Sequence, residues 1–347
     1  MKSTHHIHIG DARHMGALSD ASVQLIVTSP PYPMVEMWDS SFGALAPESL
    51  PFLEAGQGMA AFESQHQVLD AVWAECVRVL MPGCFLCINI GDATRSVGGE
   101  FCLYPNHSRI MAACLRLGLT PLPDILWRKP TNAPNKFMGS GMLPAGAYVT
   151  YEHEYILIFR KGGKRIFSEE EQVRRRTSAY FWEERNRWFS DLWTDLVGTG
   201  QKMRGPRERS AAFPFELPFR LIQMYSLQGD RVLDPFVGTG TTMAAALATG
   251  RSSVGMEYQL DMRPQILDSL RSAFAEGPRL AAARLRAHAA EMVSRESKGK
   301  DCKHQSLPYG FPVLTSQEVG LQLLVPAQWT EQADHLEVDH SPAPLVG

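Results

Sequence analysis

The sequence has few cysteines, and their spacing predicts no metal site. Two of the six, Cys84 and Cys87, lie three positions apart within the apolar run 84–90. We expect this run to be a strand, in which side chains three positions apart point to opposite faces and cannot share a ligand. No second Cys or His pair stands at the spacing of a zinc site. We therefore interpret all six cysteines as reduced thiols with mostly structural roles.

Long apolar runs and an excess of positive charge are also absent. No segment approaches the roughly 18 apolar residues of a membrane span, and the N-terminus shows no apolar leader, so we expect a cytoplasmic protein without a membrane partner. The formal net charge of the 347 residues is −3, which excludes a chain that is basic throughout. Any surface for nucleic acid must therefore come from local clusters of Lys and Arg.

What the sequence does contain is an alternation of strand-like and helix-like segments. Apolar runs of strand length recur between segments of helical periodicity, and a hydrophobic content of 44% can fill a sizeable core. This alternation predicts an α/β fold. The expected strands are residues 6–9, 23–28, 84–90, 125–128, 155–160, 232–234 and 253–257, and the expected helices are residues 62–80, 106–117, 215–227, 241–249 and 262–294.

The first chemical motif, Thr-Ser-Pro-Pro-Tyr at residues 28–32, follows an expected strand. Two prolines end any strand pairing because neither can donate a backbone hydrogen bond. They also stiffen the chain, so that the carbonyls of Ser29 and Pro30 point in fixed directions at a strand end. In open α/β sheets, ligands bind at such strand ends. Tyr32 places an aromatic ring beside these acceptors.

This motif suits methyl transfer to an exocyclic amine of a nucleobase. Such an amine is a poor nucleophile because its lone pair is delocalised into the ring. Acceptors bonded to its two N–H groups can draw the nitrogen toward a tetrahedral geometry and stabilise the positive charge that develops. Ser29 Oγ and a proline-flanked carbonyl can supply these acceptors while Tyr32 stacks on the base. The candidate catalytic residues are therefore Ser29, Pro30, Pro31 and Tyr32.

The second motif, Asp-Pro-Phe-Val-Gly-Thr-Gly-Thr-Thr at residues 234–242, follows another short apolar run. Gly238 and Gly240 permit unusual backbone angles and the close approach of a ligand. The motif lacks the Gly-Lys-[Ser/Thr] ending of a phosphate loop. Glu257 ends the next strand-like run, and in nucleotide-binding sheets an acidic residue about 20 positions after the glycines bonds the ribose hydroxyls. The pattern therefore indicates a nucleoside-containing cofactor.

Together the two motifs resemble the amino-methyltransferases of DNA, whose signature is [Asp/Asn/Ser]-Pro-Pro-[Tyr/Phe/Trp]. Serine in the first position, preceded by threonine, is similar to the cytosine-N4 branch, whereas aspartate is usual in the adenine-N6 branch. The order, with the catalytic motif before the glycine motif, resembles the β class. The resemblance covers roughly residues 5–265. It implies an α/β, Rossmann-like methyltransferase fold with a mixed seven-stranded sheet that is circularly permuted.

The resemblance also implies that the cofactor is S-adenosyl-L-methionine. Phe236, Gly238 and Gly240 would line its methionine part, and Glu257 would hold the ribose. Asp11 would bond the adenine. In the segment before the glycine motif, phenylalanine at position 213 replaces the usual histidine of the family. The full set of candidate cofactor residues is Asp11, Thr28, Phe213, Pro214, Asp234, Pro235, Phe236, Gly238, Thr239, Gly240, Thr241 and Glu257.

On this resemblance the chain divides into four parts. Residues 1–160 form the catalytic half, residues 161–210 a target-recognition insertion, residues 211–294 the cofactor-binding half, and residues 295–347 an extension of unassigned role. Residues 160–210 hold 13 Lys or Arg against 8 Asp or Glu, with aromatic residues interleaved. The partner implied is double-stranded DNA. The candidate DNA contacts are Arg174, Arg175, Arg176, Arg185, Arg187, Lys202 and Arg204.

Residues 34–61 follow Tyr32 directly and show little periodicity. We expect them to form a mobile loop. A target base must leave the duplex to reach an active site, and this loop is a candidate for closing over it. Glu36, Trp38 and Asp39 begin the segment and are candidates for contacts with the base or the backbone.

Several functions are compatible with these motifs. The first is methylation of cytosine N4 in double-stranded DNA, within a restriction-modification system whose endonuclease acts separately, and adenine N6 is the alternative target. The second is methylation of RNA or protein, but there the motif usually reads Asn-Pro-Pro-Tyr and follows the glycine motif. The third is a non-catalytic DNA-binding subunit, which the intact Ser29 disfavours. Cytosine-C5 methylation is set aside because the chain contains no Pro-Cys pair for the nucleophile.

Overall fold

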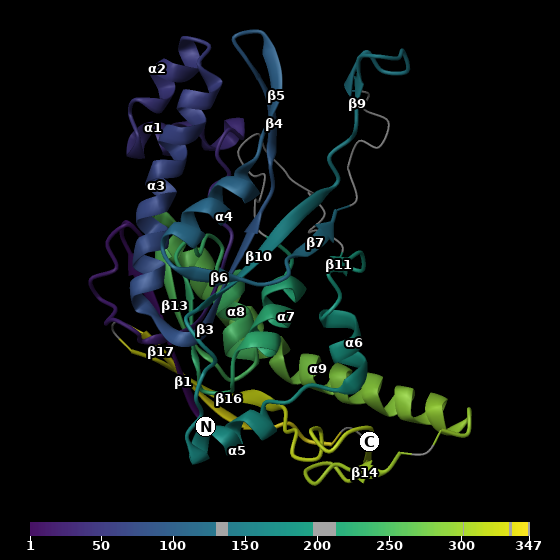
Figure 1. The fold of residues 1–347 in the computed structure, drawn as a ribbon. Helices are drawn as coiled ribbons and strands as arrows, with labels where there is room; N and C mark the ends of the chain where they lie inside the picture. Colours follow the sequence, from purple (N-terminus) through teal and green to yellow (C-terminus); the bar gives the residue numbers. More distant parts are fainter. Residues whose placement is uncertain (130–137, 197–212, 301, 333–334, 346–347) are drawn as a thin grey trace.

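A large β-sheet forms the centre of the protein. The computed structural model describes residues 1–129, 138–196, 213–300, 302–332 and 335–345. Within these residues the largest sheet has eleven strands, and seven of them are its central strands. In spatial order the seven are β7 (Ile125–Arg128), β10 (His153–Lys161), β3 (Leu80–Ile90), β2 (Val23–Thr28), β12 (Arg231–Asp234), β13 (Ser252–Glu257) and β1 (Lys2–Ile9) (Figure 1).

These seven central strands are the seven that the sequence predicts. Strand β10 is antiparallel to both of its neighbours, β3 and β7, whereas β3, β2, β12, β13 and β1 are parallel to one another. The predicted mixed, Rossmann-like sheet is therefore confirmed. Strand β2, which leads into the proline motif, lies beside β12, which leads into the glycine motif. Two motifs that are far apart in the sequence thus follow neighbouring strand ends.

Four more strands widen the sheet at its two sides. Strand β11 (Leu192–Trp193) pairs with β7, and β6 (Leu119–Pro121) pairs with β10. On the other side β17 (His335–Pro342) pairs with β1, and β16 (Leu324–Glu331) pairs with β17. The C-terminal extension, for which the sequence suggests no structure, therefore forms an edge of the main sheet.

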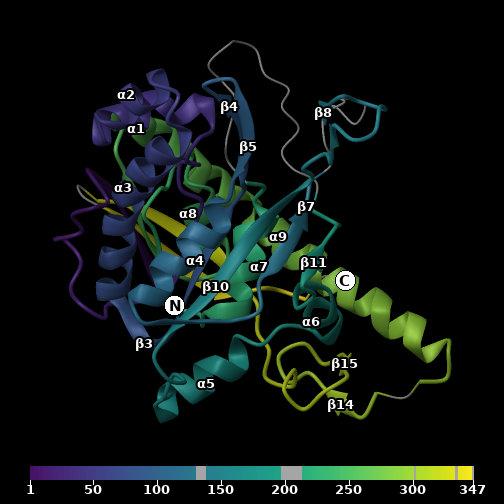
Figure 2. The same cartoon turned by 45° about the horizontal axis from the view of Figure 1, so that its top comes forward.

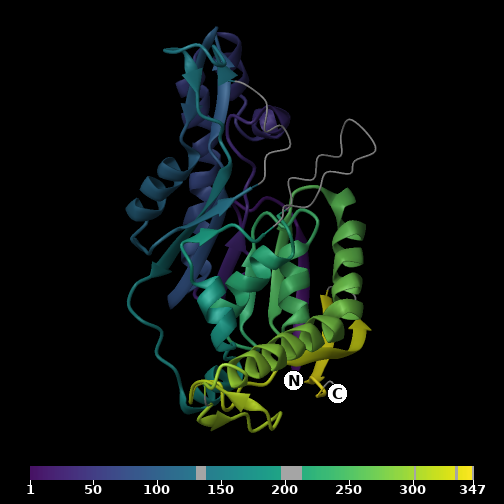
Figure 3. The same cartoon turned by 90° about the vertical axis from the view of Figure 1, so that its right-hand side faces the viewer.

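Helices cover both faces of the sheet. Along β2, Ile26 packs with the helices of one face, whereas Leu25 and Val27 pack with those of the other, as the alternation of side chains along a strand requires. By the same rule Cys84 and Cys87 of β3 enter opposite cores, and all six cysteines are free. Helices α3 (Gly58–Val79) and α4 (Asn106–Arg116) form one layer, and α7 (Glu216–Tyr225), α8 (Thr241–Ala248) and α9 (Arg263–Glu296) form the other (Figure 3).

Helix α9 is long and bends near its middle (Figure 3). Pro278 lies inside the helix, where it removes a backbone donor and clashes with the preceding turn. Gly277 precedes it, and a Cβ at that position would lie 2.6 Å from the Pro326 ring of β16. The close approach of β16 therefore requires glycine here. Beyond the bend, the second half of α9 extends toward the C-terminal extension.

The expectation of a mobile loop at residues 34–61 is wrong. These residues form a 3-10 helix (Glu36–Trp38) and two helices, α1 (Asp39–Leu45) and α2 (Ser49–Glu54), before α3 begins. Phe42 is buried in the same core cluster as Trp73 of α3. Residue Ser49 is fully buried, and the Glu48 carboxylate accepts a 3.0 Å hydrogen bond from Ser64. Packing against α3 thus orders a segment whose own periodicity is weak.

The remaining elements project from the two ends of the sheet. Helices α1 and α2 lie beyond one end, with the hairpin of β4 (Ala93–Val97) and β5 (Glu100–Tyr104) and the hairpin of β8 (Met138–Gly139) and β9 (Ala147–Tyr148), and α5 (Glu169–Thr177) lies at the other end (Figures 1 and 2). None of the helices among the residues described is both long enough and apolar enough to cross a bilayer. The elements not yet given are α6 (Trp182–Trp188), a 3-10 turn (Leu260–Met262), β14 (His304–Gln305) and β15 (Pro312–Val313).

Candidate active site

The proline motif and the glycine motif meet at the carboxyl ends of β2 and β12. These strands are parallel and adjacent, with Ile26 opposite Leu233. Two positions after Ile26, the Thr28 hydroxyl donates a 2.6 Å hydrogen bond to Oδ1 of Asp234, which directly follows Leu233. Both side chains are buried. The structure therefore brings together the two motifs from which a methyl-transfer site was predicted.

Tyr32 lies at the centre of a polar network. Its hydroxyl donates to Oε2 of Glu154 at 2.9 Å and accepts from Ser29 Oγ at 3.2 Å. Asn89 Nδ2 donates to the same hydroxyl at 2.9 Å and to Glu154 Oε2 at 2.7 Å. Lys129 Nζ lies 2.5 Å from Oε1 of Glu154. Burial, together with the adjacent Glu154 carboxylate, raises the pKa of Tyr32 well above its ordinary value, so the phenol remains protonated and donates.

The backbone of Gly91 packs closely against the ring of Tyr32. A Cβ at Gly91 would lie 3.1 Å from the tyrosine ring and 3.3 Å from Cγ of Glu154, so the bare backbone there leaves room for both side chains. Asn89 donates from Nδ2 to this network, so its Oδ1 is not part of the network. That oxygen is buried and has no partner among the described residues. It can accept a hydrogen bond from an N–H group of a bound molecule.

The sequence motifs did not include Glu154, Asn89 or Lys129. A signal was nevertheless present, because Glu154 interrupts the start of an apolar strand and Asn89 interrupts the end of another. Strands buried on both faces are expected to be continuously apolar. A polar residue near such a strand end therefore indicates either a hydrogen-bond network or a ligand.

The chain that follows Tyr32 is fixed by two buried amides. Met34 adopts a left-handed backbone with φ 65°, and its N–H donates to Gln65 Oε1 at 2.8 Å. Asn106 Nδ2 donates to the Pro33 carbonyl at 3.1 Å. Gln65 and Asn106 are fully buried on α3 and α4. The two helices therefore determine the direction in which the chain leaves the proline motif.

The three candidates that follow the motif have different surroundings. Trp38 is partly buried and packs against the large core cluster that Tyr32 and Phe236 also border. Both oxygens of Asp39 are paired with Arg95 of β4 at 2.8 Å. Glu36 is exposed. Of the three, Trp38 is the one whose side chain packs against this core.

The glycine turn is tied to Glu257 at the end of β13. The N–H of Gly238 donates to Oε2 of Glu257, and the N–H of Gln259 donates to Oε1, both at 3.0 Å. Burial raises the pKa of Glu257 above its ordinary value. Gly240 has φ 86°, and a Cβ there would lie 3.0 Å from Ile266. The turn therefore needs glycine at position 240 both for its backbone angle and for the space.

Asp11 and Glu257 lie at neighbouring strand ends. The N–H of Gly10 donates to the Glu257 carbonyl at 2.8 Å, which joins the ends of β1 and β13. The Asp11 carboxylate is paired with Arg13, which donates from Nε at 2.8 Å and Nη2 at 2.6 Å. Burial opposes ionisation of Asp11, but the bonds from Arg13 outweigh it and lower the pKa of the carboxyl. A ligand at this edge thus meets one carboxylate bonded by backbone N–H groups and one paired with arginine.

The residues present fit an adenosylmethionine. Two carboxylates at adjacent strand ends can accept hydrogen bonds from ribose hydroxyls and an adenine amine. Asp234 is buried behind the turn, and burial raises its pKa to about 6. Phe213, Thr239 and Thr241, three of the predicted cofactor residues, line one groove together with residues of α9. Of the remaining candidates, Pro214 follows Phe213, and Pro235 and Phe236 belong to the glycine motif.

The structure does not bring Arg174, Arg175 and Arg176 to this site. They belong to α5, where Arg174 donates to the Gln228 carbonyl at 3.4 Å, shortly before β12 begins. The guanidinium of Arg175 lies over the Phe167 ring at 4.7 Å. Helix α5 is thus at the amino ends of the central strands, whereas the proline and glycine motifs are at the carboxyl ends (Figure 1).

The other candidate DNA contacts lie in or after α6. Arg187 lies 3.4 Å from Glu216 and 3.6 Å from Asp195, so its charge is partly compensated. Arg185 is exposed, with its guanidinium 5.8 Å from the centre of the Phe189 ring. Lys202 and Arg204 lie outside the described residues.

Three comparisons with known proteins bear on this arrangement. The sequence matches the N6/N4 DNA methylase family over residues 23–267. It is 49% identical to Type II methyltransferase M.MthZI of Methanothermobacter thermautotrophicus over 330 residues, and this match covers 94% of this chain and 92% of that protein. It is 48% identical to Type II methyltransferase M.MjaI of Methanocaldococcus jannaschii over 279 residues, and this match covers 77% of this chain and 91% of that protein.

A solved structure agrees with these relatives. TTHA0409 of Thermus thermophilus, described as a putative DNA modification methylase and crystallised with S-adenosyl-L-methionine, superposes with a TM-score of 0.61. The two chains are 33% identical, and the match covers 78% of this chain and 94% of the other. The chain therefore belongs to the N6/N4 family of DNA methylases and is an S-adenosylmethionine-dependent DNA amino-methyltransferase.

Proposed function

We propose that this enzyme methylates the N4 amino group of cytosine in double-stranded DNA. The observation that carries the proposal is the sequence Thr-Ser-Pro-Pro-Tyr at residues 28–32, in which serine stands where the adenine-N6 branch usually has aspartate. This motif lies at the end of β2, directly beside the glycine turn. A base held by the motif would therefore face a cofactor seated at the turn.

The residues of the chain position the amine and support its developing charge. S-adenosylmethionine supplies an electrophilic methyl group, so no side-chain nucleophile is needed. Ser29 Oγ and the Pro30 carbonyl accept the two N–H groups of the amine, which favours the geometry and charge of the transition state. Tyr32 stacks on the base, and its hydrogen bond to Glu154 holds the ring in place. Trp38 follows Tyr32 by six positions and remains a candidate contact for the base.

The cofactor contacts follow from the same edge of the sheet. We assign the methionine part to Phe236, Gly238 and Gly240 and the ribose to Glu257, whose carboxylate already accepts the Gly238 N–H. Asp11 contacts the adenine from the end of β1. Thr28 and Asp234 act behind the turn, because their hydrogen bond joins the two strand ends that carry the base and the cofactor.

The DNA would approach the carboxyl edge of the sheet. Helices α1 and α2 and the β4–β5 and β8–β9 hairpins extend beyond this edge (Figure 2). The two hairpins touch through the stacked, exposed rings of Phe101 and Tyr148, whose centres are 5.1 Å apart. A duplex seated here must release its target base toward Tyr32. Arg185, Arg187, Lys202 and Arg204 remain proposed DNA contacts, whereas the arginines of α5 are too far along the sheet to share this surface.

Mass spectrometry of nucleosides tests the choice of base and atom. Plasmid DNA from a host without its own methyltransferases should contain N4-methylcytosine when the host expresses this chain, and less of it when the host expresses the Tyr32→Ala variant at the same level. N6-methyladenine in its place would overturn the proposal in favour of the adenine branch. Labelled methyl transfer to tRNA or protein but not to duplex DNA would contradict DNA methylation altogether.

The proposed biological setting is a restriction-modification system. Two curated relatives carry the name Type II methyltransferase. We therefore expect methylation at one short sequence, with protection of that sequence against a separately acting endonuclease. Single-molecule sequencing of a host genome with and without the protein would report the base and its context together. Methylation scattered without a common sequence would contradict this setting.

A further inference from the structure

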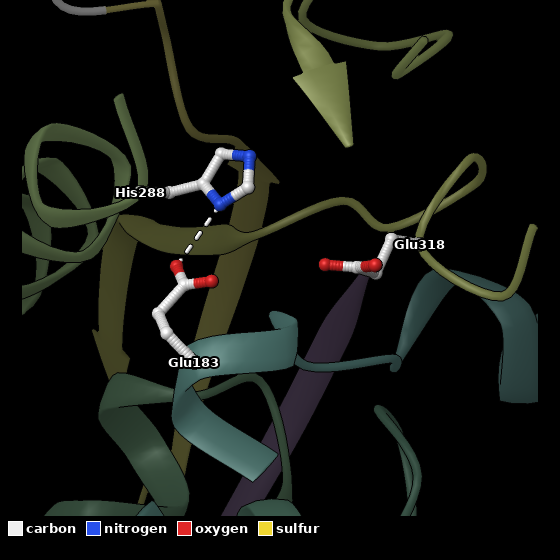
Figure 4. Close-up of side chains that lie close together, drawn as sticks. All are labelled: Glu183, His288 and Glu318. Atoms are coloured by element: carbon white, nitrogen blue, oxygen red, sulfur yellow. Dashed lines mark hydrogen bonds and ion pairs between the residues drawn. The ribbon is translucent and has the colours of Figure 1, made fainter. Parts of the chain in front are cut away.

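Three ionisable side chains from distant segments meet away from the active site. Glu183 belongs to α6, His288 to the second half of α9, and Glu318 to the C-terminal extension between β15 and β16 (Figure 4). One nitrogen or oxygen ligand atom from each side chain lies within 4.8 Å of the other two. His288 and Glu318 are buried and Glu183 is partly buried. No other such group of three or more was found in the part of the chain that the structure describes.

The surroundings of His288 determine which of its nitrogens is free. The ring is stacked on Phe181, with ring centres 4.1 Å apart, and a tilted Phe311 ring lies 4.8 Å away. Nε2 donates to the Pro312 carbonyl at 2.9 Å, so this nitrogen carries a hydrogen. Nδ1 faces Oε1 of Glu183 at 2.9 Å. If His288 is neutral, two lone pairs face each other here, and only a cation between them makes the contact favourable.

The charge of the cluster distinguishes a proton from a metal ion. A proton on His288 satisfies Oε1 of Glu183 but leaves the group with a net charge of −1. Oε2 of Glu183 is buried and has no partner among the described residues. The nearby guanidinium of Arg284 is bound to Glu184 at 2.6 and 2.8 Å and supplies no further compensation. A divalent ion bound to neutral His288 and two carboxylates brings the charge to zero and gives Oε2 a partner.

Hydrogen bonds from the surrounding residues orient His288 and Glu318, as they commonly orient metal ligands. A metal-bound histidine usually donates its other N–H to a carbonyl or carboxylate, as His288 does to Pro312. Glu318 is oriented by the N–H of Trp182 at 2.8 Å and by the N–H and hydroxyl of Thr315 at 2.7 and 2.8 Å. Oε2 accepts both bonds from Thr315, whereas Oε1 accepts only the Trp182 N–H and retains a lone pair for a further partner. The carboxylate is therefore held in place without being saturated.

We propose that Glu183, His288 and Glu318 bind one divalent transition-metal ion and that Zn²⁺ fits the site best. One imidazole and two carboxylates are ligands that zinc accepts, and three protein ligands leave a fourth position for water. The ion would fasten the C-terminal extension to α6 and α9. Because α6 carries Arg185 and Arg187, it would also hold the segment that we propose to contact DNA. The ligands are far apart in the sequence, which explains why their spacing shows no metal motif.

Metal content measured on the full chain, purified without a histidine tag, tests the proposal. Protein stripped with a chelator and dialysed against Zn²⁺ should retain one more equivalent of zinc than His288→Gln treated identically. The matched control is His304→Gln, which removes an exposed histidine of the same extension and should bind zinc as the wild type does. The result is a difference between variants, so zinc bound elsewhere, such as at the histidines of β1 and β17, cancels.

A second variant guards against misfolding of His288→Gln. Glu183→Gln keeps the volume of a side chain that is 25% exposed and removes only its charge. Co²⁺ added to the stripped wild type should give visible absorption bands of a tetrahedral site, which Glu183→Gln should weaken or abolish. Zinc should raise the melting temperature of the stripped wild type but not that of either variant. Equal zinc content in wild type and His288→Gln, with no shift in melting, would overturn the proposal and assign the position between the side chains to a proton.

Discussion

The hydroxyl of Tyr32 donates a 2.9 Å hydrogen bond to Oε2 of Glu154, although 122 positions separate the two residues in the sequence. Asn89 Nδ2 donates to both partners, and Lys129 lies against the other carboxylate oxygen. The aromatic residue of the proline motif is therefore oriented by β3 and β10 and not by its own strand alone. The hydrogen bonds reach the ring's outer end, so they control its tilt over a bound base.

Replacement of Tyr32 by alanine should separate catalysis from cofactor binding. The variant loses the stacking surface for the base, which is worth about 1–3 kcal/mol, whereas the glycine turn lies on the neighbouring strand and keeps its contacts. We expect methyl transfer to fall by roughly tenfold to a hundredfold, with the dissociation constant of S-adenosylmethionine nearly unchanged. Steady-state kinetics and calorimetry measure the two quantities. A large loss of cofactor binding would contradict the assigned role.

The hydrogen bond between Tyr32 and Glu154 should act through the position of the ring. Glu154→Gln removes the charge that orients the phenol, and Tyr32→Phe removes the donor. Because hydrogen bonds to charged groups contribute about 1.5–3 kcal/mol, each change should lower kcat by roughly tenfold or more. The effects should not add in the double variant, since both remove the same interaction.

A neighbouring carboxylate provides the control for this prediction. Glu152 lies two positions before Glu154 and pairs with exposed Arg128 at 3.2 Å, whereas the hydroxyl of Tyr32 bonds Glu154. Glu152→Gln should therefore leave kcat close to that of the wild type. Additive losses in the double variant of Tyr32 and Glu154 would mean that the two residues act independently.

The fold was predictable where apolar periodicity is strong. All seven central strands and five of the longer helices were expected within a few residues of their observed bounds. The short helices at residues 36–54 were missed because their periodicity is weak and contacts such as the burial of Phe42 against α3 order them. The edge strands β16 and β17 were missed because β17 mixes charged and apolar residues and is stabilised by pairing with β1.

The candidate site was predictable only in part. The proline and glycine motifs are contiguous in sequence, and the expectation that they lie together required only that their strands be neighbours. Glu154 and Asn89 join the site through strand order and register, which short sequence patterns do not encode. The arginines of α5 were assigned to DNA from charge density and position in the chain. Where these arginines lie depends on the path of the chain across the sheet. Neither charge density nor position in the sequence reveals that path.

Replacement of Gly240 by valine should weaken cofactor binding, which the Tyr32→Ala change should leave nearly intact. Gly240 has φ 86°, which costs other residues about 1–2 kcal/mol, and a new Cβ would lie 3.0 Å from Ile266. The turn must shift, and we expect the affinity for S-adenosylmethionine to fall at least tenfold in calorimetry. Gly99→Val is the control, because its φ of 85° carries the same strain with nothing within 4 Å. Equal losses in both variants would show that strain alone is responsible.

Asp234 should make stability depend on pH in a defined direction. Burial raises its pKa to about 6 from the ordinary 3.8, so the folded protein prefers the protonated form. The penalty for ionising Asp234 is absent below pH 4 and complete above pH 6. As the pH rises from 4.5 to 7.5, the wild type should lose about 2 kcal/mol of unfolding free energy relative to Asp234→Asn. Urea titrations at the two pH values measure this difference. The control is Asp191→Asn, at an exposed position, which should follow the wild type at both pH values.

The C-terminal edge of the sheet should respond to pH in the opposite direction. Ser3 bridges two buried imidazoles, with His5 at 2.9 Å and His340 of β17 at 2.8 Å. Burial, followed by neighbouring positive charges, lowers the pKa of His340 to about 4, and burial with adjacent histidines lowers that of His5 to about 3. Stability from these neutral rings is present above pH 6.5 and is lost as the pH falls, because the unfolded chain binds protons first.

At pH 5 each of these histidines should have lowered the free energy of unfolding by at most about 2 kcal/mol relative to pH 7.5. Replacing His340 with glutamine, which cannot be protonated, should remove its share of this acid sensitivity. The same substitution at exposed His304 should leave the pH dependence unchanged. If His340→Gln and the wild type lose the same free energy between pH 7.5 and 5, then the pairing of β17 with β1 does not depend on a neutral imidazole at this position.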